Sequence, residues 1–180
     1  MDKIDKFHVN VAKNVQGLSN NTPAVVALSC LKWYRLSTHL SKELLVFGEH
    51  IMKLPTESIY KRLFIARVLE LRRNNVLNDN SIVGIMLQKC QRYSLLNNLY
   101  SMIIDGTKCN NWVKAIKERV NQKEECELKA TLMMYRSLTI FHKVKISLNS
   151  GFIWWFIAKR NVKILYKVKV IMRALVTNND

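Results

Sequence analysis

Glycine and proline are scarce in this chain, which has 5 glycines and 2 prolines among its 180 residues. Folds built from many short strands need these residues at their turns, so the composition disfavours such folds. Long stretches without either residue instead place apolar side chains at helical spacing, as at Leu40, Leu44, Phe47 and Ile51. The sequence therefore predicts an all-α protein, an irregular helical bundle of six to eight helices with a basic C-terminal helical extension.

Helix-end signals place most of these elements. Ile4, Phe7, Val11 and Val15 form one stripe, and Gly17 is typical of the residue just after a helix. Similar patterns predict helices over residues 23–33, 36–54, 54–73, 81–90 and 94–103, and a long helix from Trp112 onward. The expected core consists of Phe7, Val11, Leu28, Leu44, Phe47, Leu63, Phe64, Leu99, Trp112 and Ile116.

The C-terminal part differs from the rest in charge. We expect one helical domain over residues 1–141 and a basic aromatic extension over 142–180. Residues 128–179 contain ten Lys and Arg and no acid. Residues 162–173 alternate like a strand but also fit a helical stripe, and their length and leucine-rich context favour a helix.

The formal net charge of +16 makes polyanions the natural partners of this chain. Nucleic acid and anionic membrane surfaces both fit, while the plain alternative is a protein from a Lys- and Asn-rich proteome. Two groups of side chains are candidate nucleic-acid contacts: cations on the outer side of the 54–73 helix, and a tail in which tryptophans could stack on bases while cations follow phosphates. These are Lys61, Arg62, Arg72, Arg73, Trp154, Trp155, Lys159, Arg160, Lys163 and Lys167.

Two other interpretations of the tail remain open at this point. The same mixture of aromatic and basic residues over 152–176 suits a helix lying on an anionic membrane. It also suits core tryptophans followed by a solvated basic face.

Arg67 raises a separate question, because the helical wheel puts it between Leu63, Phe64 and Tyr60 on one side and Leu71 on the other. A buried, unpaired guanidinium is very unfavourable. Arg67 must therefore pair with a carboxylate such as Glu43 or Glu49, reach solvent by extending its side chain, or contact a phosphate.

Complete catalytic motifs are missing from the sequence. There is no P-loop, GxGxxG, HExxH or GxSxG motif, and Asp79 and Asp105 are isolated in predicted loops. The "EEC" stretch at 124–126 resembles a solvated helix face. We therefore expect no enzyme activity, no cofactor and no metal site.

The cysteines and the hydropathy pattern indicate a location inside the cell. None of the four cysteines forms a CxxC pair, so we expect reduced and mostly buried thiols. The opening "MDKIDKFHVN" is polar, and no apolar run reaches the roughly 18 residues of a membrane span. The expectation is an intracellular protein, nuclear or cytoplasmic, with no transmembrane segment.

The stretches "DKFHVNVAKNVQGLSNNT", "ALSCLKWYRLSTHLSKELLVFGEHIMKLPTESIYKRLFIARV", "LLNNLYSMIIDG" and "NNWVKAIKERV" share an order with a known family. Together they resemble the segment downstream of the reverse transcriptase domain in LINE-type (non-LTR) retrotransposon polyproteins of invertebrates. The resemblance covers roughly residues 3 to 140, and its motifs are loose. The matching positions are Gln16, Gly17, Leu18, Trp33, Gly48, Leu54, Pro55, Phe64, Arg67 and Trp112.

The family resemblance implies a place beside the polymerase thumb and a role in holding template RNA or target DNA. The paired-aspartate polymerase motif, the endonuclease domain and the Cys/His zinc element of that family have no counterpart here. We therefore expect a non-catalytic fragment that binds RNA or DNA non-specifically and in a salt-dependent way. Other domains of such a polyprotein are further candidate partners. The alternatives are a structural or interaction remnant with no nucleic-acid role, or a membrane-surface protein.

Overall fold

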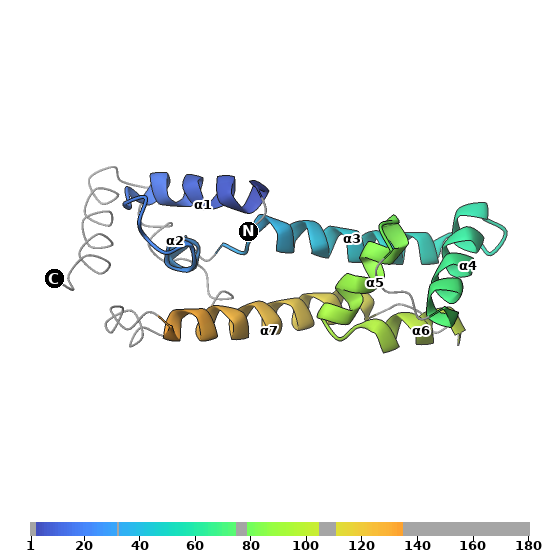
Figure 1. Cartoon of the computed structure of the whole chain (residues 1–180). Coiled ribbons are helices and arrows are strands. Elements are labelled where there is room, and N and C mark those ends of the chain that lie inside the picture. Colours follow the sequence, from blue (N-terminus) through green and yellow to red (C-terminus); the bar gives the residue numbers. More distant parts are fainter. Residues whose placement is uncertain (1–2, 32, 75–78, 105–110, 135–180) are drawn as a thin grey trace. The chain divides into compact units, whose positions relative to one another are not determined.

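The chain is all-α in the part that the structure describes, which confirms the predicted fold class. A computed structural model describes residues 3–31, 33–74, 79–104 and 111–134, in which seven helices and no strands occur (Figure 1). The helices are α1 (Lys3–Gln16), α2 (Ala24–Leu31), α3 (Leu36–Lys53), α4 (Ile59–Arg73), α5 (Ile82–Arg92), α6 (Leu96–Ile104) and α7 (Trp112–Met133).

Two compact units divide the chain. The first joins Met1–Ser37 to the stretch that starts at Glu124, and the second consists of Thr38–Lys123. One boundary lies in the first turn of α3 and the other lies inside α7. The expected boundary between residues 141 and 142, the basic extension and the helix or strand at 162–173 lie outside the described residues and stay predictions.

In the first unit, α1 packs on α2 around a small apolar cluster. Gly17 ends α1 with a φ of 66°, a left-handed conformation that glycine adopts without strain. The buried Gln16 amide donates to the carbonyls of Ala12 and Ala27, at 2.9 and 2.7 Å, so it connects the two helices. The buried cluster consists of Val9, Ala12, Leu18, Ala27, Leu28 and Leu31.

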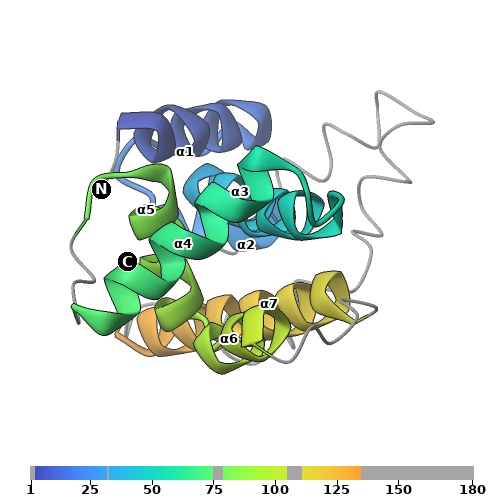
Figure 2. The ribbon, with the colours of Figure 1, turned by 90° about the vertical axis from the view of Figure 1, so that its right-hand side faces the viewer.

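In the second unit, α4 packs on α5 and α5 packs on α6, as can be followed in Figure 2. Trp112 at the start of α7 is buried, and its indole Nε1 donates to the Leu45 carbonyl of α3 at 3.0 Å. Such a bond satisfies the one polar atom of an otherwise apolar side chain. The core consists of Leu45, Phe64, Val68, Leu71, Met86, Leu87, Cys90, Tyr93, Leu95, Leu99, Met102, Trp112, Ile116 and Val120.

Half of the predicted core is buried and half is not. Leu28, Phe64, Leu99, Trp112 and Ile116 are buried as predicted. The prediction is wrong for Phe7, Phe47 and Leu63, which are half or mostly exposed. Val11 and Leu44 are only partly buried. The exposed fractions are 69% for Phe7, 49% for Phe47 and 62% for Leu63.

The error in α1 has a clear physical cause. This helix carries apolar residues on two sides, and the side with the smaller ones, Val9 and Ala12, faces α2. Asp5 lies on the same buried side because its carboxylate accepts hydrogen bonds from the backbone N–H and the hydroxyl of Ser37, at 3.0 and 2.7 Å. A hydrogen-bonded carboxylate can be buried at a tolerable cost, so Phe7 is left outside.

The start of α4 also differs from the prediction. A helix was expected from residue 54, but α4 begins at Ile59. Residues 54–58 form a turn instead, in which the Ser58 N–H donates to the Pro55 carbonyl at 3.0 Å. Leu54 is biased away from helical backbone angles because it precedes a proline.

We predict that Leu99→Ala lowers the free energy of unfolding by about 2–5 kcal/mol, because Leu99 is fully buried and its truncation leaves a cavity. Leu63→Ala removes the same atoms from an exposed position and should change it by less than about 0.5 kcal/mol. Urea unfolding followed by circular dichroism measures both variants. Equal losses would contradict the observed orientation of α4.

Candidate nucleic-acid interface

Helix α4 buries a narrow stripe and exposes most of its surface. Phe64, Val68 and Leu71 are its buried residues, and they belong to the core of the second unit. Such a stripe covers only part of the circumference of a helix. The remaining circumference is therefore available to the cations of this helix.

The four predicted cations of α4 occur as two pairs, Lys61–Arg62 and Arg72–Arg73. The pairs are 11 residues apart, which is about three helical turns and roughly 16 Å along the axis. Because 11 residues are close to a whole number of turns, Lys61 lies almost in line with Arg72, and Arg62 lies almost in line with Arg73. The helix thus presents two short rows of cations.

The four side chains differ in how they are held. Arg62 and Arg73 are exposed, and no side-chain partner is seen for them among the described residues. Lys61 is partly buried, and its ammonium donates to the Leu54 carbonyl at 3.0 Å. Arg72 is exposed but its guanidinium carbon lies 4.4 Å from the centre of the Tyr100 ring of α6.

Arg67 pairs with two carboxylates rather than with the expected ones. Its Nη1 donates to Glu70 at 2.7 Å and its Nη2 donates to Asp79 at 2.9 Å, so Glu43 and Glu49 were the wrong partners. The hydrogen bond to Glu70, and then the one to Asp79, raises the pKa of Arg67 above its ordinary value. The expectation that Arg67 lies within an apolar face is also wrong, because its neighbours Tyr60 and Leu63 are exposed.

Asp79 connects this ion pair to the start of α5. Its carboxylate accepts from the Ser81 hydroxyl as well as from Arg67, and these hydrogen bonds hold the pKa of Asp79 below its ordinary value. The Ser81 hydroxyl in turn accepts from the Gly84 N–H at 3.1 Å and caps α5. Any Cβ at Gly84 would collide with the Asp79 backbone, so this close approach requires glycine.

Several exposed cations of the same unit are not among the predicted contact residues. Helix α7 carries Lys114, Lys117, Arg119 and Lys123 there, and the ion contact of Lys114 with Glu118 is long at 4.0 Å. The signal was present in the sequence as "KAIKER". Residues 38–123 contain twice as many Lys and Arg as Asp and Glu, so α4 belongs to a unit that is itself positively charged.

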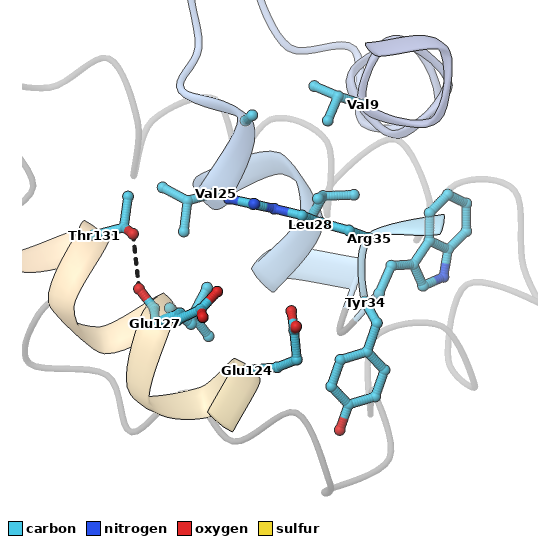
Figure 3. Close-up of a pocket in the computed structure, with 11 residues that line it drawn as sticks. Val9, Val25, Leu28, Tyr34, Arg35, Glu124, Glu127 and Thr131 are labelled. Carbon is cyan, nitrogen blue, oxygen red and sulfur yellow. Dashed lines mark hydrogen bonds between the residues drawn. The ribbon is translucent and has the colours of Figure 1, made fainter. Parts of the chain in front are cut away.

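The first unit contains a small open pocket of about 50 Å³ between apolar and acidic side chains. Glu124 and Glu127 of α7 line one side, and Arg35 crosses the other side next to Val25 and Leu28 (Figure 3). Glu124 is 7% exposed, so the prediction of a solvated face is wrong at this residue. A pocket of this size has room for a few water molecules and already contains a cation of its own.

Burial and nearby carboxylates both act on the Tyr34 phenol at this pocket. Burial, followed by the nearby charges of Glu125 and Glu124, raises the pKa of Tyr34 above its ordinary value. The phenol therefore stays protonated at neutral pH.

The cysteines match the expectation only in part. Cys90 is buried, and burial raises the pKa of its thiol to about 12, which keeps it protonated and unreactive. Cys126 is exposed, which agrees with the solvated face predicted for residues 124–126. The side chain of Cys30 and the whole of Cys109 lie outside the part of the chain that the structure describes.

Six of the predicted contact residues cannot be placed. They lie beyond residue 134, outside the described residues, and stay predictions: Trp154, Trp155, Lys159, Arg160, Lys163 and Lys167.

Within the described ranges, no three His, Cys, Asp or Glu side chains are grouped so as to hold a metal ion. None of the described helices combines the length and apolar character needed to cross a bilayer.

Comparisons with protein-family models, with curated proteins and with solved structures return no match to this chain. The interpretation of α4 therefore depends on its own geometry and charge.

We predict that Asp79→Ala lowers the thermal midpoint of unfolding at neutral pH. Because the pKa of Asp79 is lower in the folded state than in the unfolded chain, its contribution is complete above the unfolded pKa and is lost as pH falls through the folded one. The difference from the unmodified protein should therefore shrink in acid.

Thermal unfolding followed by circular dichroism, repeated over a series of acidic buffers, measures this difference. Glu118→Gln is the control, because it removes an exposed carboxylate whose ion contact with Lys114 is long at 4.0 Å. A difference for Asp79→Ala that stays constant down to strongly acidic pH would contradict the proposed ionic link.

Proposed function

We propose that this chain is a non-catalytic, nucleic-acid-binding helical fragment, derived from a retrotransposon polyprotein, that contacts the phosphates of RNA or DNA. The observation that carries the proposal is the arrangement of the cations of α4 in two pairs, three of whose members are exposed. The net charge of +16 supports it. The origin rests on the sequence resemblance alone.

The spacing of the two pairs suits a phosphate backbone. Roughly 16 Å corresponds to about five nucleotide steps, at about 3.4 Å per step along one strand of a duplex. Each pair can therefore contact a separate phosphate of the same strand. Contacts of this kind carry no sequence information, so binding should be largely independent of sequence.

A second candidate is an interaction module that docks another domain of the same polyprotein. It is favoured by an apolar patch on the first turns of α4, formed by Ile59, Tyr60 and Leu63, which are 64%, 72% and 62% exposed. Patches of exposed large apolar side chains often mark protein contacts. On the helical wheel Ile59 lies beside Arg62, while Tyr60 and Leu63 lie further round the helix, so the surfaces of the two candidates adjoin each other on α4.

We predict micromolar or tighter binding of labelled single-stranded RNA and duplex DNA, measured by fluorescence anisotropy at two salt concentrations. Displacement of counterions makes the logarithm of affinity fall with the logarithm of salt concentration. Replacing Arg62 and Arg73 by Gln should make the slope for duplex DNA shallower by about 2.

The matched control is Lys114→Gln with Lys117→Gln, which also removes two exposed charges from the second unit. It should weaken binding less and leave the slope nearly unchanged. Equal effects of the two double variants would show that binding follows overall charge and not α4. Absence of binding at low salt would overturn the proposal and favour the interaction module.

The predicted contacts of the tail require their own variants. Replacing Lys159, Arg160, Lys163 and Lys167 by Ala should weaken binding if the tail follows the phosphate backbone. Loss of binding to anionic vesicles when Trp154 and Trp155 are replaced, without loss of oligonucleotide binding, would instead favour the membrane-surface alternative.

A further inference from the structure

Arg72 and Tyr100 meet across two helices of the second unit. The guanidinium carbon of Arg72, in the last turn of α4, lies 4.4 Å from the centroid of the Tyr100 ring in the middle of α6. This distance is well within the range of a cation–π contact. Tyr100 is itself held in place, because it is half-buried and follows the fully buried Leu99.

An aromatic ring attracts a guanidinium through its π-electrons and, unlike a carboxylate, does not pair with its N–H donors in a bidentate hydrogen bond. The five N–H donors of arginine point outward in the plane of the guanidinium, in the geometry that binds two oxygens of one phosphate. No carboxylate is seen in contact with Arg72 within the described ranges, and the residue is exposed. Its donors are therefore free to bind a ligand while its orientation is restricted.

Arg67, only five residues earlier, shows the opposite arrangement. Its guanidinium is bound by Glu70 and Asp79, so a phosphate would have to displace two carboxylates. Arg73, next to Arg72, is exposed, and no aromatic ring is seen against it among the residues that the structure describes. Of these three arginines, Arg72 alone is oriented by a neighbour that leaves its donors free.

We propose that Tyr100 is a positioning residue that holds the guanidinium of Arg72 ready to bind a phosphate of the nucleic acid. This inference rests on the proposed function. Ordering a long side chain opposes binding, and an arginine that is already oriented loses less freedom when it binds. Tyr100 therefore strengthens binding without contacting the ligand through a charge of its own.

The test uses the full chain and a labelled single-stranded RNA, with anisotropy measured over a range of salt concentrations. Tyr100→Leu removes the ring and should weaken binding by about two- to fivefold, the strength expected of an exposed cation–π contact. The salt slope should not change, because no charge is lost. Tyr100→Phe keeps the ring and should bind like the unmodified chain.

Arg72→Gln completes a double-mutant cycle. It should weaken binding and make the salt slope shallower by roughly one. In that background Tyr100→Leu should have no further effect, because the side chain that it positions is gone. Thermal unfolding of each variant shows whether the fold is retained, and Tyr100→Phe keeps the test valid if Tyr100→Leu unfolds.

The other possible results contradict either the role of Tyr100 or the proposed function. An equal loss from Tyr100→Leu with and without Arg72 would show that Tyr100 acts through the fold and not through Arg72. A loss from Tyr100→Phe as large as that from Tyr100→Leu would exclude the ring contact as the cause. Weakening by Arg72→Gln alone would overturn only the role of Tyr100, whereas no RNA binding by the unmodified chain would overturn the proposed function as well.

Discussion

The orientation of α4 depends on the burial of Phe64, Val68 and Leu71 in the core of the second unit. A helix cannot turn about its axis without moving such a stripe into water, and fully burying a large apolar side chain is worth roughly 1.5–3 kcal/mol. In the same core, Gly48 of α3 makes room for Met86 of α5, because a Cβ at Gly48 would lie 2.8 Å from the Met86 sulfur.

Polar contacts fix the same orientation from outside the core. Arg67 reaches Asp79, and Asp79 with Ser81 forms the start of α5, so the ion pair connects α4 to its neighbour. Both Nη atoms of Arg67 are hydrogen-bonded to carboxylates of the same unit. The arginines of α4 therefore differ in their surroundings. Arg67 is paired with carboxylates, while Arg62, Arg72 and Arg73 are exposed.

The sequence was sufficient to predict that the chain is helical and where most helices lie, because scarce glycine and proline leave few other structures open. It was insufficient to choose the buried face of α1. That helix has apolar residues on two sides, and the choice depends on Ser37, which binds Asp5 across 32 residues of sequence. The same limit applies to α3, which buries Thr38, Ser41 and Glu49 while Phe47 is half exposed.

At the candidate interface too, the sequence predicted features within one helix but not contacts between elements far apart in the chain. The exposed positions of Arg62, Arg72 and Arg73 follow from spacing within one helix, and the sequence predicted them. The partners of Arg67 and Arg72 do not follow from spacing, because Asp79 lies in a connecting segment and Tyr100 lies on α6, 28 residues from Arg72. Such pairs form only when the helices have packed.

The central claim is that α4 meets the nucleic acid through its exposed arginines. Chemical modification of arginines, quantified residue by residue with mass spectrometry in the presence and absence of single-stranded RNA, tests it most directly. The account predicts that RNA protects Arg62, Arg72 and Arg73 more strongly than Arg119, which is exposed on α7, while Arg67 reacts slowly in both cases because it is bound by two carboxylates. RNA that binds without protecting the arginines of α4 would contradict the claim.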